Sequence, residues 1–194
     1  LPKPERFPLS LRIPQWCDRP VLTVNGTEET LAVSDGFARL DREWNDGDEL
    51  ILHLPMEVKL SSRDRYAVSV ERGPLVYVLP VGESWHRIVE REKFHDWEIY
   101  PTTSWKYGLL EGASFQVAET SGELPKQPFD PARSPVKLRT KGRLIRDWAM
   151  EGNNAGAPPM NPNAAGQPDC ELELVPYGGP KLRIGEFPLI RNRA

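Results

Sequence analysis

Apolar and polar residues alternate in short segments along the first third of the chain. Every second residue from Phe7 to Ile13 is apolar, which is the two-residue period of a half-buried strand. The same kind of pattern, or a short run of β-branched residues, recurs downstream. These predicted strands cover residues 21–24, 31–33, 37–40, 49–60, 66–70 and 74–79.

Tight turns are predicted between these strands. Asn25-Gly26 is the dipeptide best suited to a type I′ hairpin turn, because both central residues need positive φ. Ser34-Asp35-Gly36 and the stretch from Asn45 to Asp48 have similar turn chemistry. Pro55 interrupts the 49–60 segment, which predicts a bulge or an edge position there.

The second half of the chain has a less regular pattern. Residues 81–100 are rich in charge and show no clear period, and residues 124–135 are rich in proline. Residues 152–168 predict a long loop that either binds something or ties the chain to a neighbouring domain. Further strands are predicted at residues 105–110, 114–118, 136–140, 143–146, 170–175 and 181–184, with a last hairpin ending at residues 187–189.

These patterns predict an all-β protein. The chain holds 20 prolines in 194 residues, and each proline inside a helix costs about 3 kcal/mol, so long helices are not expected. Short strands at this spacing indicate β-sandwiches. We predict two consecutive small, jelly-roll-like sandwich domains, 1–85 and 86–194, with one composite sandwich as the alternative.

Charge, hydropathy and cysteine content limit the partners. A net charge of −3 is too small to favour capture of nucleic acid or of a membrane surface, and no apolar run reaches the roughly 20 residues that span a bilayer. Cys17 and Cys170 are far apart and neither has a partner at metal-ligand spacing. Two free thiols are favoured over one long-range disulfide, and neither a metal nor a cofactor is expected. The first residue, Leu1, fits a processed protein or an excised domain.

Several segments, in this order, resemble the C-terminal part of glycoside hydrolase family 127, the β-L-arabinofuranosidase family. No single segment is specific, but together they extend from near the first residue to near the last. The matching segments are LSLRIPQWC at 9–17, VNG at 24–26, WNDGDEL at 44–50, LPM at 54–56, RGPLVY at 72–77, WKYGL at 105–109, LVPYG at 174–178, LRI at 182–184 and FP at 187–188.

The resemblance implies a particular place in a larger protein. Proteins of this family look like an (α/α)₆ barrel followed by two small β-sandwich domains, and the barrel holds the catalytic residues, a zinc-held cysteine with further cysteines and a glutamate. No segment here matches that site, so no catalytic residue is assigned to this chain. We expect a non-catalytic region that packs on the catalytic barrel of its parent protein.

Two residue groups are candidate sites in their own right. Asp46 and Asp48 flank a glycine, but turn chemistry explains them better than metal binding does. Trp97, Trp105 and Tyr107 are the stronger candidates, because sugars stack on exposed aromatic rings. Burial at an interface with the catalytic barrel is favoured for these three residues, with a carbohydrate-binding module as the alternative function.

Overall fold

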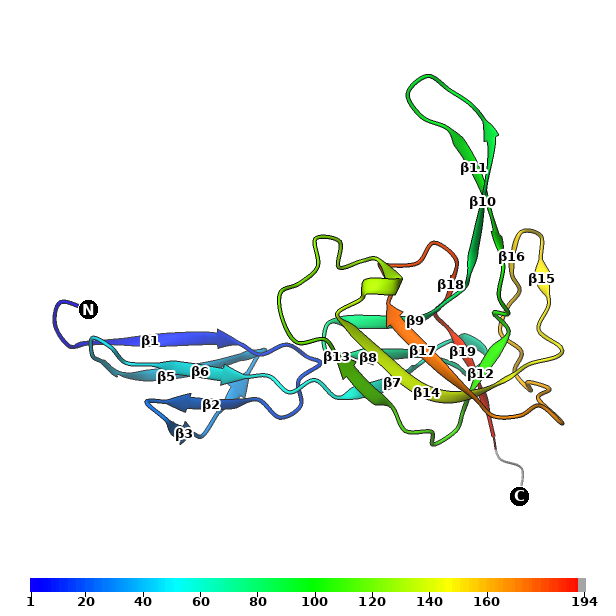
Figure 1. Cartoon of the computed structure of the whole chain (residues 1–194). Helices are drawn as coiled ribbons and strands as arrows, with labels where there is room; N and C mark the ends of the chain where they lie inside the picture. The colour runs from blue at the N-terminus through cyan, green and yellow to red at the C-terminus, as the bar shows by residue number, and fades with distance from the viewer. Residues whose placement is uncertain (192–194) are drawn as a thin grey trace. The chain divides into compact units, whose positions relative to one another are not determined.

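The computed structural model describes residues 1–191, and strands dominate that part of the chain (Figure 1). The two helical elements in it are three-residue 3₁₀ turns, Asp64–Tyr66 and Pro131–Arg133. The predicted all-β class is therefore confirmed.

The residue contacts divide the chain into two compact units. The first unit holds residues 1–57 and 72–74, and the second holds residues 58–71 and those from 75 onward. The second unit thus begins at residue 58, whereas the domain boundary was predicted near residue 85. That boundary remains a prediction about folding domains.

The first unit contains two three-stranded sheets. The strand orders are β1-β5-β4 and β3-β2-β6. The strands are β1 (Glu5–Arg12), β2 (Val21–Val24), β3 (Thr27–Glu29), β4 (Val33–Ser34), β5 (Phe37–Trp44) and β6 (Leu50–His53). Alternate residues such as Leu22, Val24 and Ala38 are buried, as the two-residue period requires.

The predicted turns close these strands. Asn25 and Gly26 have φ of 53° and 78° between β2 and β3, so both adopt the positive φ of a type I′ turn. Asp35 and Gly36 repeat the same two values between β4 and β5. Asp48 ends the next turn, where its carboxylate accepts hydrogen bonds from the Asn45 amide at 2.9 Å and the Asn25 side chain at 2.8 Å.

The second unit is built on a sheet that closes on itself. Its strand order is β18-β9-β17-β14-β12-β19-β8-β7, and β9 also pairs with β8, so six strands from β9 round to β8 form a barrel-like sheet. The strands are β7 (Val58–Ser62), β8 (Ala67–Arg72), β9 (Leu75–Pro80), β12 (Tyr107–Leu110), β14 (Val136–Leu144), β17 (Cys170–Pro176), β18 (Arg183–Ile184) and β19 (Phe187–Ile190), and β13 (Gln116–Glu119) pairs with β14. The predicted sandwich arrangement remains a prediction.

Large side chains fill the barrel-like sheet. Tyr77, Leu138, Leu174 and Phe187 are fully buried within one hydrophobic cluster. Two glycines let neighbouring strands approach closely: a Cβ placed on Gly142 would lie 2.5 Å from the carbonyl oxygen of Gly108 on the paired strand.

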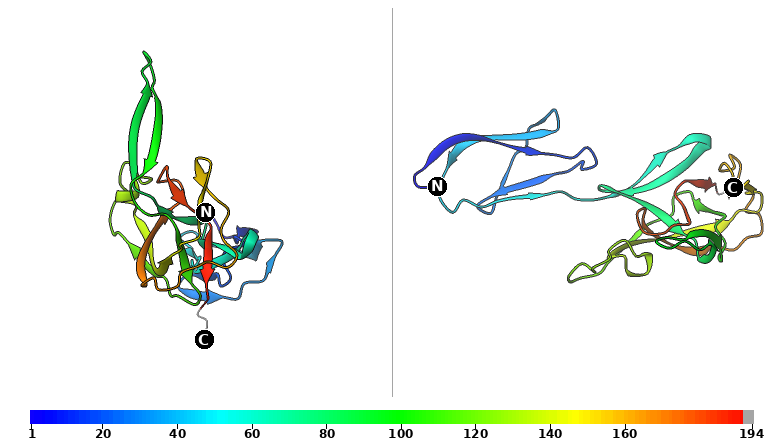
Figure 2. Two further views of the ribbon diagram at one scale, coloured as in Figure 1. Left: turned by 90° about the vertical axis from the view of Figure 1, so that its right-hand side faces the viewer. Right: turned by 90° about the horizontal axis from the view of Figure 1, so that it is seen from above.

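A long hairpin projects from this unit. Strands β10 (Glu83–Val89) and β11 (Asp96–Pro101) pair with each other and with no other strand in the described part of the chain. Figure 1 and the left view of Figure 2 both show it standing out from the barrel-like sheet. The expectation of irregular chain over residues 81–100 was wrong, because charged residues on both faces of the hairpin mask the alternation.

The predicted long loop at residues 152–168 is held by specific hydrogen bonds. A short ladder, β15 (Met150–Glu151) with β16 (Asn154–Ala155), precedes most of it. The buried Trp148 indole donates to the carbonyl of Gly156 at 2.7 Å, and the amide of Asn163 donates to the Asp147 carboxylate at 2.9 Å. Tertiary contacts therefore fix a segment with almost no regular structure.

Candidate functional site

The structure separates the three aromatic residues that were predicted as a carbohydrate or interface site. Trp97 lies on β11 of the hairpin and is 47% exposed. Trp105 and Tyr107 are half-buried against the core of the barrel-like sheet, and Trp105 meets Trp148 edge to face at 5.2 Å. The three rings therefore form no common exposed row.

One face of the hairpin carries a corner of two indole rings. The strand register pairs Arg87 with Trp97 and Trp85 with Ile99, so these four side chains share a face. The rings of Trp85 and Trp97 lie 6.1 Å apart at 74°, and each is nearly half exposed. This arrangement presents one open ring face beside the edge of a second ring.

The opposite face of the hairpin is more polar. Here the register pairs Ser84 with Tyr100 and His86 with Glu98. The Tyr100 hydroxyl donates to Glu98 Oε2 at 2.5 Å, and this hydrogen bond together with the negative charge raises the pKa of Tyr100. The ring of His86 packs on the edge of Tyr100 at 5.3 Å.

Local interactions order the tip of the hairpin. Arg91 forms an ion pair with Asp96 at 2.7 Å, and its guanidinium lies 5.7 Å from the centre of the Phe94 ring. Phe94 is nevertheless 65% exposed, and Ile88 on β10 is 54% exposed. Apolar side chains therefore face solvent from the tip as well as from the indole corner.

A single carboxylate fixes the base of the hairpin. Glu83 Oε1 accepts from the backbone amides of Lys181 at 2.7 Å and Leu182 at 2.8 Å, and its Oε2 accepts from the Trp85 indole at 3.0 Å. The Gly82 amide adds a bond to the Thr103 hydroxyl at 2.8 Å. We name residues 83–101 the hairpin arm, because its base is held rigidly while its rings remain exposed.

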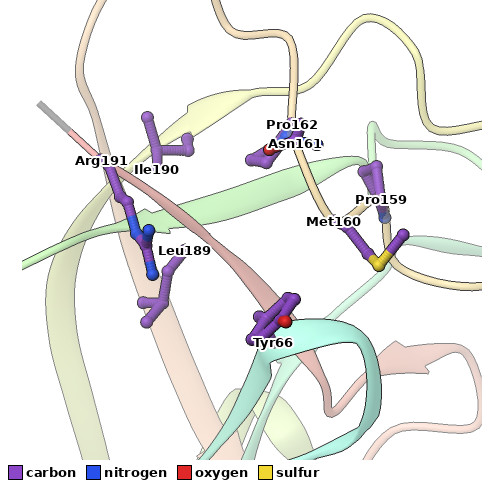
Figure 3. A pocket seen from close by; sticks show the side chains of 8 residues that line it. All are labelled: Tyr66, Pro159, Met160, Asn161, Pro162, Leu189, Ile190 and Arg191. Carbon is purple, nitrogen blue, oxygen red and sulfur yellow. The ribbon is translucent and has the colours of Figure 1, made fainter. Parts of the chain in front are cut away.

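The second unit also contains a cavity of about 590 Å³, here named the Tyr66 pocket (Figure 3). Its lining residues come from the turn before β8, from the long loop and from the end of β19. They are Tyr66, Pro159, Met160, Asn161, Pro162, Leu189, Ile190 and Arg191. The loop was predicted from its sequence as a possible binding element, whereas Tyr66 was predicted within a strand and no feature of the sequence indicates that it lines a cavity.

Other chemistry predicted from the sequence takes structural roles. Cys17 and Cys170 are free thiols in different units, and burial is the main cause that raises the pKa of Cys170. The hydrogen bond from the Asn45 amide, then that from Asn25, lowers the pKa of Asp48, as expected of a turn carboxylate. Within residues 1–191, no three His, Cys, Asp or Glu side chains are grouped to hold a metal. The same residues contain no helix with the length and hydropathy of a membrane span.

A hollow of about 630 Å³ in the first unit is lined partly by acidic residues, among them Asp18, Glu28 and Glu29. Glu29 lies 3.7 Å from Arg42, and Arg19 at the same hollow is paired with Glu57. The Glu57 hydrogen bond raises the pKa of Arg19. Two of the charged residues that line this hollow, Arg19 and Glu29, therefore already have ion-pair partners within the chain.

The comparison with protein families matches the first part of the chain. Residues 2–56 match the model of the middle domain of GH127 β-L-arabinofuranosidases. The match is to a middle domain, so the predicted C-terminal placement remains a prediction. No curated protein sequence matches the chain.

Solved structures resemble nearly the whole chain. A GH127 β-L-arabinofuranosidase from Geobacillus stearothermophilus T6 matches 98% of this chain with a TM-score of 0.62 and 20% identity. A protein described as a glycoside hydrolase matches 96% of this chain with a TM-score of 0.61 and 24% identity. A GH127 β-arabinofuranosidase also matches 96% of this chain, with a TM-score of 0.62 and 18% identity. At sequence identities this low, the TM-scores show a shared fold and nothing further.

The chain spans about a quarter of these relatives. It covers 27% of the first structure and 28% of each of the other two. The fold of this chain is therefore similar to one part of multidomain glycoside hydrolases.

Proposed function

We propose that this chain is a non-catalytic, C-terminal all-β region of a glycoside hydrolase that resembles β-L-arabinofuranosidases, and that it supports an (α/α)₆ catalytic barrel. The family match at residues 2–56 and the partial coverage of longer hydrolases support this assignment. The resemblance implies that catalysis takes place in the barrel, on a cluster of cysteines. The two cysteines of this chain lie in different units and form no such cluster.

The hairpin arm is the observation that carries the proposal. An isolated two-stranded hairpin is marginally stable in water, and exposed apolar patches mark interaction surfaces. Trp85, Ile88, Phe94 and Trp97 are each 46% or more exposed on this arm. A rigid base with uncovered rings fits an element that packs on a neighbouring domain, and we assign the catalytic barrel as that neighbour.

Reconstitution from two polypeptides tests the proposal. The catalytic barrel of the parent protein is produced separately, mixed with this chain and analysed by size-exclusion chromatography with light scattering. We expect a 1:1 complex that is lost when Trp85 and Trp97 are both changed to Ser. Tyr177→Ser is the matched control, because Tyr177 is 51% exposed on the same unit but lies outside the arm.

Two results would contradict the proposal. One is the absence of a complex between the barrel and a folded wild-type chain. The other is hydrolysis of an arabinofuranoside by this chain alone at an enzyme-like rate, which would place a catalytic site within it.

A carbohydrate-binding module is the second candidate function, favoured by the indole corner at Trp85 and Trp97. Open ring faces of this kind stack on sugar C–H groups. Titration of the chain with arabinan and arabinoxylan, followed by tryptophan fluorescence, tests it. Saturable binding that Trp97→Ala abolishes would assign the arm to a sugar, whereas an unchanged spectrum over the whole titration would leave the scaffold role.

A further inference from the structure

We infer that the Tyr66 pocket binds a neutral saccharide unit, as a second site apart from the hairpin arm. The choice of a sugar as the ligand class rests on the proposed function in a glycoside hydrolase. The pocket itself rests on the geometry of three segments that lie far apart in sequence: the turn before β8, the long loop and the end of β19.

The backbone beside the pocket holds an unusual conformation. Arg65 and Tyr66 are consecutive non-glycine residues with φ of 58° and 61°. This left-handed region is uncommon for side chains larger than Asn or Asp, and such residues gather at functional sites. The conformation leaves the Tyr66 ring 74% exposed at the pocket.

Two hydrogen bonds keep this turn in place. The Arg63 amide donates to the carbonyl of Ala67 at 2.8 Å and closes the turn. The Arg65 side chain donates from Nε to the carbonyl of Pro158 at 2.8 Å, across 93 residues of sequence. The second bond ties the turn directly to the loop that forms the facing wall.

The facing wall is also held firmly. Pro159 and Pro162 fix two φ angles in the loop, and the amide of Arg146 donates to the carbonyl of Asn163 at 2.9 Å. Ala164 next to it is buried in the core cluster. The pocket is therefore formed before any ligand arrives, which lowers the ordering cost of binding.

The lining side chains suit a sugar. Figure 3 shows Tyr66 opposite Asn161 and Arg191 opposite Met160, around an open space. A tyrosine ring supplies a stacking face, while the Asn161 amide and the Arg191 guanidinium supply planar donors and an acceptor for neighbouring hydroxyls. Met160 and Leu189 add apolar contact for the C–H groups of a sugar ring.

Charge and size favour a neutral ligand of this class. Arg191 is the charged residue among those that line the pocket, and Glu111 lies 3.8 Å from its Nε. This carboxylate offsets the positive charge, so the pocket has little excess charge to attract an anion. The volume of about 590 Å³ falls within the range of roughly 300–1,000 Å³ that holds small molecules.

Calorimetric titration of the 194-residue chain tests the inference. The probes are methyl β-L-arabinofuranoside, arabino-oligosaccharides and xylo-oligosaccharides. We expect at least one to bind saturably, and Tyr66→Asn to weaken that binding about tenfold through loss of the ring. Asn tolerates positive φ, so this variant is expected to unfold at an unchanged or higher temperature. Tyr66→Phe keeps the ring and is expected to bind within about threefold of the wild type.

Tyr100→Ala and Tyr177→Ala are the matched controls, because each removes an exposed ring of the same unit that does not line the Tyr66 pocket. Unchanged binding in both, with weakened binding in Tyr66→Asn, supports the pocket. Binding that Tyr66→Asn leaves intact overturns it, and so does the absence of binding with every probe. Neither negative result affects association with the catalytic barrel, which depends on the hairpin arm and is measured separately.

Discussion

The barrel-like sheet and the hairpin arm belong to one compact unit, but the sheet buries its large apolar side chains and the arm leaves them exposed. In the sheet, Tyr77 and Phe187 are completely buried, because six strands close around them. In the arm, the strand register places Trp85 and Trp97 on one face, yet each remains nearly half exposed. A two-stranded ribbon has no second layer to cover either face.

This difference shows that alternation alone does not bury a side chain. A strand places every second residue on one face, but burial depends on whether another strand or layer lies over that face. The barrel-like sheet provides its own cover, whereas the arm requires cover from another molecule or domain. The proposed packing of the arm on a catalytic barrel follows from this contrast.

Truncating one ring in each region should give the largest difference in the free energy of unfolding between them. We expect Phe187→Ala to lower the free energy of unfolding by about 3–5 kcal/mol, because it leaves a cavity in the closed sheet. Trp97→Ala on the arm is expected to cost less than about 1 kcal/mol in the isolated chain. Urea unfolding followed by circular dichroism measures both, and equal costs would refute the contrast.

Adding one methyl group tests how tightly the barrel-like sheet is closed. We expect Gly142→Ala to destabilise the chain by about 1–3 kcal/mol, because the new Cβ would lie 2.5 Å from the Gly108 carbonyl oxygen. Lys141→Ala, at an exposed position on the same strand, is the control and should stay within about 0.5 kcal/mol. Equal melting temperatures for Gly142→Ala and the wild type would show that the strands can separate.

Removing the anchor of the arm should loosen it without unfolding the sheet. Glu83→Ala leaves the amides of Lys181 and Leu182 without their carboxylate acceptor, at a local cost of about 1 kcal/mol. We expect faster hydrogen exchange at these two amides and along the arm, while the amides of β14 stay protected. Uniform acceleration across the unit would mean that the arm and the sheet open together.

The smallest predicted effect on the free energy of unfolding concerns the ion pair between Lys137 on β14 and Glu173 on β17. The hydrogen bond from Lys137 at 2.7 Å is the main cause that lowers the pKa of Glu173, and Arg139 adds to it. This pair stabilises the fold above the unfolded carboxyl pKa of about 4.3 and is lost as pH falls through the lowered folded value. Because Glu173 is partly exposed, the effect should stay below about 1 kcal/mol.

Urea unfolding of the wild type and of Glu173→Gln at pH 7 and pH 3 measures how much the ionised Glu173 carboxylate contributes to the free energy of unfolding. We expect the variant to be less stable at pH 7 and the two proteins to converge at pH 3. A difference that persists at pH 3 would show that the carboxylate acts through something other than its charge.

The elements predicted from the sequence agree best with the structure where neighbouring residues determine the backbone conformation. The Asn25-Gly26 turn and the strand before it form as predicted, because positive φ and the two-residue period are properties of neighbouring residues. The strand after the turn is β3, Thr27–Glu29, so the predicted strand at 31–33 was wrong except for Val33, which begins β4. The hairpin arm was missed because polar residues such as Arg87 and Glu98 share its two faces with the rings. A hairpin that buries neither face has no hydrophobic pattern to reveal it.

The candidate site depended on tertiary structure to a greater degree. The sequence grouped Trp97 with Trp105 and Tyr107, but the fold places Trp97 on the arm and the other two against the core. The sequence pattern predicts Tyr66 as the start of a strand. Its exposure instead follows from a left-handed turn, which the hydrogen bond from Arg65 to the distant Pro158 carbonyl helps to hold. Neither outcome is visible in the residues adjacent to these positions.

Local patterns in the chain were enough to predict the all-β class, most strand positions and the tight turns, because backbone preferences and side-chain alternation act over a few residues. Tertiary structure decided that β8 and β9 close a sheet, that β12 and β19 run parallel, and that the arm stays uncovered. Those outcomes depend on what lies above each face and on pairing between residues up to 121 positions apart, as for Ala67 and Pro188, which no local pattern contains.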